Sequence, residues 1–317
     1  MKTVQAISNA LSGSKIIFEE IWENEYLTEH EEVVLDSDTE NLFFGMDNKR
    51  AAGYIIKNMD MSSKIQLAYI DPPFFTGNKQ MMRGQSKKTQ VAYNDVWKSK
   101  EEYLTSIAVS LRIIHTLLSD TGSLWVHLDR RAVHEVKIII DEIFGEENFV
   151  NEVIWSYKSG GAGKKSFARK HDNLLFYRKS KDFKFFLPKE KSYNRGCKRY
   201  AFKDVKEYQD EKGWYTLVNM RDVWEIDMVG RTSRERVGYA SQKPELLLER
   251  IITSCTEKGD IVCDIYSGSA TAAVVAGKTG RKFIAVDNAG QAIDNTVERL
   301  INNGISFKII KHEDDII

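Results

Sequence analysis

The amino-acid sequence predicts an α/β fold with a mostly parallel sheet and helices on both of its faces. Two segments support this prediction, because residues 41–71 and residues 260–287 each have the pattern of a strand, a helix and a second strand. A helix between two strands returns the chain to the same edge of the sheet, so the strands that it joins are parallel. The alternation is lost from about residue 180 to residue 236, which predicts a second, smaller lobe.

The composition is that of a folded, soluble protein. Its 317 residues are 42% hydrophobic and 29% charged, and no apolar run has the length needed to cross a bilayer. The first residues lack the apolar core of a secretory signal. The three cysteines, Cys197, Cys255 and Cys263, show neither paired nor metal-ligand spacing, and the six histidines are scattered. We therefore expect a cytoplasmic protein that holds no metal and is not bound to a membrane.

The first strand–helix–strand unit ends at a candidate catalytic residue. Residues 65–70 are almost continuously apolar, as in a parallel strand that is buried on both faces. Asp71 follows, and Pro72 and Pro73 then end the strand, because proline has a fixed φ angle and no N–H for the sheet. We expect Asp71 at the carboxyl end of the strand, where open α/β sheets bind ligands, with Phe74 beside it. An ordinary strand-ending turn is the alternative.

Other elements follow from hydrophobic periodicity and from glycine and proline positions. Residues 1 to about 35 predict one or two amphipathic helices. Residues 76–94 are polar and lysine-rich, and they predict a long loop that orders over a bound substrate. Further strands are predicted at 123–129, 149–157, 173–177 and 305–310, and further helices at 101–119, 132–144, 245–255 and 292–302.

Charge is balanced over the whole chain but not along it. The sequence has 46 basic and 46 acidic residues, yet the segment from Lys158 to Lys206 has sixteen Lys or Arg against four Asp or Glu, a net of +12. Aromatic residues are interleaved with these cations, which is typical of a surface that contacts nucleic-acid phosphates. A solvated charged face is the alternative.

The second strand–helix–strand unit has the pattern of a nucleotide-cofactor site. A strand leads into a turn of small residues around Gly268, a short helix follows, and the next strand ends in Asp287. Small residues let the backbone approach a ligand, helix N–H groups face that ligand, and a carboxylate at the next strand end can accept two ribose hydroxyls. The pattern lacks the further glycines of a full dinucleotide fingerprint.

Three motifs together carry a family resemblance. Asp71-Pro72-Pro73-Phe74 resembles the catalytic motif of amino-methylating DNA methyltransferases. Gln242-Lys243-Pro244 and the stretch from Asp264 to Thr271 resemble the S-adenosylmethionine-binding motifs of that family. The catalytic motif precedes the cofactor motif, with a basic region between them, which is similar to the permuted beta class of DNA adenine N6-methyltransferases. The resemblance covers roughly residues 41–300.

The resemblance implies a Rossmann-like methyltransferase fold with a seven-stranded sheet and S-adenosylmethionine as methyl donor. It divides the chain into a helical extension (1–40), a catalytic part (41–179), a target-recognition region (180–236) and a cofactor-binding part (237–317). The catalytic residues would be Asp71, Pro72, Pro73 and Phe74. The cofactor-binding residues would be Asp47, Gln242, Lys243, Pro244, Asp264, Tyr266, Ser267, Gly268, Ser269, Ala270, Thr271, Asp287 and Asn288.

The chain departs from the family pattern in the cofactor motif. Ala270 stands where the family usually has glycine, and Ile265-Tyr266 stands where it usually has Pro-Phe. A methyl group at Ala270 is expected to crowd the methionine part of the cofactor or to oppose a positive φ angle.

The implied reaction needs little beyond positioning. Asp71 and the Pro72 carbonyl would accept the hydrogens of the exocyclic amine, so that its lone pair points at the methyl sulfonium. The adenine must be flipped out of the duplex, and Phe74 offers a face on which it can stack. Contacts to bases or phosphates are expected from the target-recognition region, with the candidates Trp214, Tyr215, Arg221, Trp224, Arg231, Arg234 and Arg236.

Several alternatives remain open at this point. A cytosine N4-methyltransferase uses similar chemistry, although that family more often has serine in place of Asp71. A nicotinamide-dependent oxidoreductase would use the glycine turn and Asp287 but leaves the catalytic motif without a role. A DNA-binding protein that has lost activity through Ala270 is a third alternative. The expected partner is double-stranded DNA; a homodimer is common in this class, and a cognate restriction endonuclease is a further candidate partner.

Overall fold

The computed structural model describes residues 2–24, 30–83, 89–159, 165–201, 203–239 and 241–311. The helices are α1 (Lys2–Glu23), α2 (Asn48–Lys57), α3 (Lys100–Leu117), α4 (Val133–Phe144), α5 (Glu245–Cys255), α6 (Thr271–Lys278) and α7 (Gly290–Asn302). The strands are β1 (His30–Val34), β2 (Leu42–Phe44), β3 (Ile65–Ile70), β4 (Lys79–Arg83), β5 (Thr89–Asn94), β6 (Leu118–Leu128), β7 (Phe149–Ser156), β8 (His171–Arg178), β9 (Lys189–Tyr193), β10 (Glu207–Asp210), β11 (Gly213–Asn219), β12 (Val223–Glu225), β13 (Ile261–Asp264), β14 (Lys282–Val286) and β15 (Phe307–Lys311).

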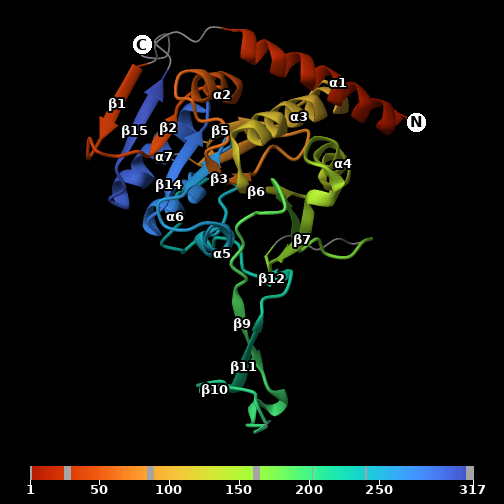
Figure 1. Cartoon of the computed structure of the whole chain (residues 1–317), viewed down its shortest axis with the longest axis vertical. Helices are drawn as coiled ribbons and strands as arrows, with labels where there is room; N and C mark the ends of the chain where they lie inside the picture. The colour runs from red at the N-terminus through yellow and green to blue at the C-terminus, as the bar shows by residue number, and fades with distance from the viewer. Residues whose placement is uncertain are drawn as a thin grey trace.

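A large sheet crosses the molecule in the order β1-β15-β2-β14-β13-β3-β6-β8-β7-β12 (Figure 1). The predicted α/β class is confirmed, and most neighbouring strands are parallel, with antiparallel pairs where β8 joins β6 and β7 and where β1 joins β15. The sheet has ten strands in place of the predicted seven. One apolar core lies under α1–α4 on one face, and a second lies under α5 and α6 on the other.

Strand β3 lies inside the sheet between β13 and β6, and every residue of Ile65–Ile70 is buried, as its nearly continuous apolar sequence predicts. Helix α3 begins where Ser99 caps it, since the Ser99 hydroxyl accepts the backbone N–H of Glu102 at 3.1 Å. Asp47 caps α2 in the same way by accepting the N–H of Lys49 at 2.9 Å. These caps fix where the helix before β3 and the helix after β3 begin.

Two predicted elements differ from the structure. The N-terminal extension was expected to be helical, but residues 30–34 form β1, which pairs with β15 at the edge of the sheet. The exposed edge of β15 is satisfied by this pairing, which a local helix pattern does not reveal. The predicted loop at 76–94 contains the hairpin β4–β5, and residues 84–88 of that prediction lie outside the described residues. Across the described part of the chain, no helix is long and apolar enough to span a membrane.

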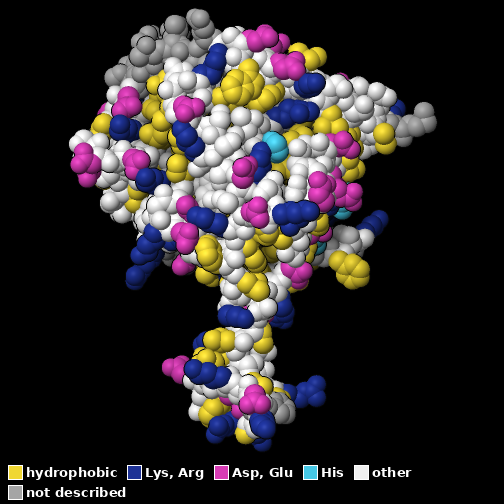
Figure 2. Space-filling view, viewed as in Figure 1, with side chains coloured by type: hydrophobic (Ala, Val, Ile, Leu, Met, Phe, Trp, Pro, Cys, Tyr) yellow, Lys and Arg dark blue, Asp and Glu magenta, His cyan; other side chains and the backbone are white. Residues whose placement is uncertain are grey.

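A three-stranded antiparallel sheet, β10-β11-β9, projects from the body as an arm of residues 189–219 (Figure 1). Lys and Arg side chains are prominent on it, with apolar and acidic ones between them (Figure 2). Tyr193 and Tyr208 both lie opposite Tyr215 on neighbouring strands. Their rings are 5.5 and 5.6 Å from that of Tyr215, and Lys191 lies 4.6 Å over the same ring. The arm therefore combines aromatic rings with cations on one face.

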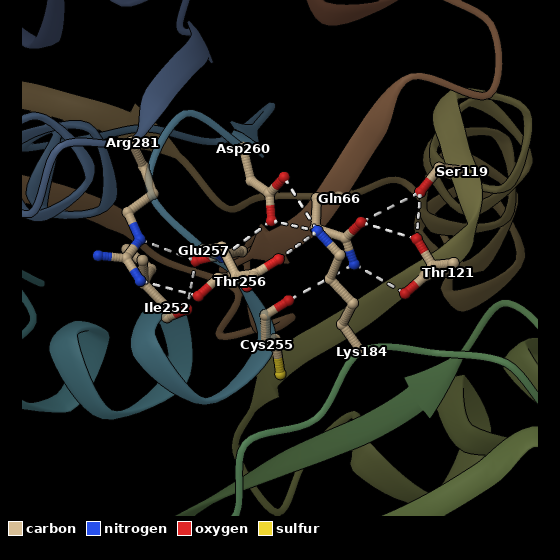
Figure 3. A network of polar contacts seen from close by, with 10 residues as sticks. All are labelled: Gln66, Ser119, Thr121, Lys184, Ile252, Cys255, Thr256, Glu257, Asp260 and Arg281. Carbon is tan, nitrogen blue, oxygen red and sulfur yellow. Dashed lines mark hydrogen bonds and ion pairs between the residues drawn. The ribbon is translucent and has the colours of Figure 1, made fainter.

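A polar network around Lys184 anchors the segment that precedes the arm to the body of the molecule (Figure 3). Lys184 pairs with Asp260 at 3.0 Å and with Glu257 at 3.1 Å. The backbone N–H of Lys184 and the side chain of Gln66 both donate to the carbonyl of Thr121, at 2.9 and 2.7 Å. Gln66 lies at the start of β3 and Asp260 precedes β13, so the anchor is at the amino ends of the central strands.

Candidate active site

A cavity of about 500 Å³ opens at the carboxyl ends of the central strands, which is a volume typical of a small-ligand site. Twelve of the predicted site residues line it: Asp47, Asp71, Pro73, Lys243, Asp264, Tyr266, Ser267, Gly268, Ser269, Thr271, Asp287 and Asn288. They come from the ends of β2, β3, β13 and β14 and from the start of α5 and α6. The topology thus brings the catalytic motif and both cofactor motifs to one cavity.

Asp71 and Lys243 form an ion pair at the edge of this cavity. The Lys243 ammonium donates to Oδ2 of Asp71 and, at 3.3 Å, to the carbonyl of Ser241. The two side chains are only 17% and 10% exposed, so the pair is largely shielded from solvent. Lys243 Nζ also lies 5.4 Å from the centre of the Phe74 ring. Lys243 therefore contacts the predicted catalytic motif directly.

Two further carboxylates give the cavity its electrostatic character. The pKa of Asp264 is raised from 3.8 to about 8, mainly by burial and also by the nearby charges of Asp71 and Asp287, against the opposing effects of the Tyr266 N–H and of Lys243. Burial also raises the pKa of Asp287, although three backbone N–H groups partly offset this. A cavity with so many acidic groups favours a ligand that brings positive charge.

Asp287 holds the glycine turn against the end of its own strand. Its Oδ2 accepts the N–H of Gly268 at 2.8 Å, and its Oδ1 accepts the N–H of Ala289 at 3.0 Å. Ser267 lines the cavity beside it, and its buried hydroxyl has no hydrogen-bond partner among the described residues. A buried hydroxyl without a partner is costly, so Ser267 is suited to bind a polar group of a ligand.

The structure decides what the alanine at position 270 does. Ala270 has φ 56° and ψ 31°, so it adopts the left-handed conformation for which the family uses glycine. Its side chain is fully buried in the core beneath α6 and is not among the residues that line the cavity. The methyl group therefore does not crowd the cavity, and its cost is confined to the backbone conformation.

Four other predicted residues also lie outside the cavity lining: Pro72, Phe74, Gln242 and Pro244. Gln242 is buried and binds backbone instead, since its amide accepts the N–H of Val237 at 2.9 Å and donates to the carbonyl of Glu235 at 2.5 Å. Pro244 caps α5. Both residues thus shape the turn that delivers Lys243, which a motif match alone does not distinguish from ligand contact.

Asp95 is a residue that the sequence did not reveal. It is fully buried, and its carboxylate accepts the N–H groups of Phe75 at 3.1 Å and Thr76 at 2.7 Å and the indole N–H of Trp97 at 3.0 Å. Its carbonyl accepts the N–H of Gly77 at 3.1 Å. Asp95 thereby holds the loop that follows the catalytic motif, where Phe75 has a positive φ of 57°, together with Trp97, which lines the cavity.

Arg299 was also missed. This buried guanidinium donates to the carbonyl of Ser269 at 2.7 Å, to the hydroxyl of Thr271 at 2.9 Å and to Glu245 at 2.9 Å. It supports the glycine turn from α7, about thirty residues further along the chain. Within the part of the chain that the structure describes, no group of His, Cys, Asp or Glu is arranged to hold a metal ion.

The family model for DNA methylases matches residues 65–298, which include most of the residues that line the cavity; Met46, Asp47 and Asn48 precede the matched range. The chain belongs to the DNA methylase family. The predicted catalytic and cofactor motifs thus line one cavity in a member of this family, and a dehydrogenase is excluded as the family.

The chain is similar to type II methyltransferases in sequence and to solved DNA methyltransferases in fold. It is 27% identical over 250 residues to the type II methyltransferase M2.LlaDCHI of Lactococcus lactis subsp. cremoris. The matched region covers 77% of this chain and 84% of that protein. The solved PvuII DNA methyltransferase, described as cytosine-N4-specific, has a TM-score of 0.58 at 16% identity, over 84% of this chain and 89% of that one. TTHA0409 of Thermus thermophilus, solved with S-adenosyl-L-methionine, has a TM-score of 0.53 at 16% identity, over 86% and 98%.

Proposed function

We propose that this DNA methylase transfers the methyl group of S-adenosylmethionine to the exocyclic N6 amine of a flipped-out adenine in double-stranded DNA. One observation carries the proposal. A single cavity is lined by Asp71 of the catalytic motif and by Asp264, Gly268 and Asp287 of the cofactor motif. Acceptor and donor of the methyl group would thus meet within one site, which is the main requirement of a direct transfer.

The cavity fits S-adenosylmethionine by its chemistry. The donor carries a sulfonium and an ammonium, and the cavity presents the carboxylates of Asp264 and Asp287 in a buried setting. The partnerless hydroxyl of Ser267 supplies a polar contact, and the turn at Gly268 lets the backbone approach closely. When bound, the cofactor supplies an electrophilic methyl group, and TTHA0409, which shares the fold, was solved with it.

Asp71 would act on the nucleophile. The lone pair of an exocyclic amine is delocalised into the base, so the amine attacks well only when its hydrogens are accepted by well-placed oxygens. The carboxylate of Asp71 is such an acceptor, and its position at the end of β3 is fixed by a fully buried strand and by two prolines. In the structure Lys243 occupies Oδ2 of this carboxylate, so this oxygen becomes available to an amine when Lys243 shifts.

Adenine is proposed over cytosine because of Asp71. The family of cytosine N4-methyltransferases more often has serine in place of Asp71. The similarity in fold to the cytosine-N4-specific PvuII enzyme keeps N4 methylation of cytosine as the second candidate.

DNA contacts are proposed for the arm and for the segment that links it to the cavity. The arm has eight Lys or Arg against five Asp or Glu, and its aromatic rings and cations lie together on one face. Arg231, Arg234 and Arg236 are exposed on the segment that leads to Tyr239, which lines the cavity. Trp224 is a poor candidate, since it is buried against Trp125.

The experiment is methyl transfer from labelled S-adenosylmethionine to duplex DNA, followed by digestion and identification of the modified nucleoside. We expect N6-methyladenine from the wild type, no product from Asp71→Ala, and normal product from the control Glu142→Ala, which changes an exposed acid on α4. N4-methylcytosine would instead support the second candidate. No label in any DNA would contradict both. Type II relatives also suggest a cognate restriction endonuclease and a cytoplasmic setting as proposals, and a homodimer is tested by light scattering of the purified protein.

A further inference from the structure

A chain of four polar side chains crosses the sheet beside the catalytic motif. The Tyr69 hydroxyl lies 2.9 Å from Nδ1 of His127, Nε2 of His127 lies 3.2 Å from Oδ2 of Asp172, and the Tyr157 hydroxyl donates to Oδ1 of Asp172 at 3.3 Å. Three of these residues come from β3, β6 and β8, and Tyr157 directly follows β7. Since β3, β6, β8 and β7 are consecutive in the sheet, the polar chain is continuous across four strands.

This polar chain is costly to bury. His127 has no exposed surface and Tyr69 is 2% exposed. Polar groups inside a core need a hydrogen bond for each donor and acceptor, and apolar side chains of similar size often fill such a space at least as stably. The cores on both sides of these strands are otherwise built from apolar residues. Packing alone therefore does not account for a histidine with a partner on each ring nitrogen.

What the polar chain orients is the Phe74 ring. The rings of His127 and Phe74 are stacked, with centroids 5.9 Å apart and planes 29° apart. Trp155 closes the histidine in from another side, with its ring edge-on at 5.3 Å. Because both nitrogens are bonded, the imidazole cannot rotate in its plane or flip without losing two hydrogen bonds. These bonds hold the plane of the imidazole, and the Phe74 ring lies against that plane.

The carboxylate of Asp172 orients the imidazole of His127. Burial alone would raise the pKa of Asp172, but hydrogen bonding to His127, the charge of Lys243 and the hydroxyl of Tyr157 together hold it below its usual value. The carboxylate is thus an acceptor, so Nε2 of His127 donates to it. Nδ1 lies beside the Tyr69 hydroxyl, and Tyr69 itself lines the cavity.

We propose that His127 is a positioning residue for the methyl-accepting base, which acts by fixing the plane of Phe74 through its bonds to Tyr69 and Asp172. His127 does not line the cavity, so its effect would pass through Phe74 and not through contact with cofactor. The proposal rests on the proposed function and on the stacking of the flipped base on Phe74 that the catalytic-motif resemblance implies. Phe74 does not line the cavity itself, but it directly follows Pro73, which does. It predicts an effect on base placement and transfer rate that leaves cofactor affinity unchanged.

The test compares His127→Phe, which keeps a ring of similar size but loses both hydrogen bonds, with His127→Gln, whose amide can still donate to Asp172. The control is His115→Phe, a partly buried histidine on α3 that packs edge-on against Phe144. Three quantities are measured on full-length protein: the dissociation constant for S-adenosylmethionine, the single-turnover methylation rate, and the fluorescence of 2-aminopurine placed at the methylated position. That position is first mapped in DNA methylated by the wild type.

We expect His127→Phe to bind the cofactor within about twofold of the wild type but to methylate about 10- to 100-fold more slowly, since small misplacement of reacting groups has effects of this size. The 2-aminopurine signal should change, because the flipped base no longer stacks on a fixed ring. His127→Gln should recover part of the rate, and His115→Phe should behave as the wild type.

A wild-type rate in His127→Phe would overturn the proposal. Equal losses of cofactor binding and rate in His127→Phe would also overturn it, because they would indicate general disruption of the fold. If the wild type, measured alongside, labels no DNA, the proposed function fails and the positioning role fails with it. If the wild type is active and only the variant results disagree, the positioning role alone fails.

Discussion

Asp95→Asn tests whether the loop after the catalytic motif must be held in place for methyl transfer. The carboxylate of Asp95 accepts three N–H groups, from Phe75, Thr76 and Trp97. An amide has the same shape but only one acceptor oxygen. Whichever way it turns, at least one N–H loses its acceptor and meets another N–H.

The size of the effect follows from the bonds that are lost. A hydrogen bond to a charged group contributes about 1.5–3 kcal/mol, and here the shortest is 2.7 Å, from Thr76 to a fully buried carboxylate. We expect a loss of about 2–3 kcal/mol, which corresponds to about 30- to 150-fold in the equilibrium between the held and released loop. Because the affected bonds are local, this should appear as opening of residues 75–77 and not as global unfolding.

Two measurements check this expectation. Hydrogen exchange at the amides of Phe75 and Thr76 should accelerate by the same factor of about 30 to 150, and kcat/KM for DNA should fall in parallel. Affinity for S-adenosylmethionine should stay within about threefold, since Asp95 does not line the cavity. The matched control is Asp141→Asn on α4, whose carboxylate accepts Lys137 and Tyr177. Unchanged exchange at Phe75 and Thr76, or faster exchange with full activity, would refute the reasoning.

Three further predictions concern the cofactor turn and the arm. The folded protein keeps a proton on Asp264 up to about pH 8, whereas the unfolded chain loses it near pH 3.8. The free energy of unfolding therefore falls as the pH rises between these values, because the unfolded chain releases the proton and the folded protein does not. A cationic cofactor is expected to bind the ionised form of Asp264, so its affinity should rise about tenfold per pH unit up to about pH 8. Titration calorimetry should show this slope in the wild type and a flatter one in Asp264→Asn. Ala270→Gly should change the free energy of unfolding by less than about 1 kcal/mol, because relief of the left-handed backbone is offset by the lost methyl burial and by a more flexible unfolded chain; a denaturant titration that finds a larger change contradicts this. The arm can be removed by replacing residues 189–219 with two glycines, because the Met220 N–H already donates to the Pro188 carbonyl at 2.9 Å. This deletion should leave cofactor binding intact but weaken DNA binding and reduce its salt dependence. Equal DNA affinity would show that the arm does not contact DNA.

The sequence predicted the elements whose signals are local. Asp71 and Asp287 directly follow short apolar strands and Asp264 ends one, and the carboxyl ends of neighbouring parallel strands meet at one edge of the sheet. The predicted helix at 245–255 agrees with α5 because its apolar period lies within the helix and its proline, Pro244, directly precedes it. Strand β1 was missed because its partner, β15, lies at the other end of the chain.

The supporting residues of the site had no such signal. Asp95 lies about twenty residues after the loop that it holds, beyond a lysine-rich segment that predicts only a loop. His127 lies near the end of an apolar strand, and nothing near it in the sequence indicates a bond to Asp172, 45 residues away. Gln242 matched a cofactor motif, yet its amide binds the backbone of residues 235–237. Motifs thus identified the region of the site, while the roles of side chains within it depended on tertiary contacts.

The junction of the arm with the body has an evolutionary consequence. The chain leaves the body at Pro188 and returns at Met220, where one backbone hydrogen bond closes the neck, and Lys184 is held separately at the amino ends of the central strands. An arm joined in this way can lengthen, shorten or be replaced without moving any residue that lines the cavity. With the proposed DNA contacts of the arm, new target preferences could thus arise by exchange of one surface module while the residues that line the cavity are inherited unchanged.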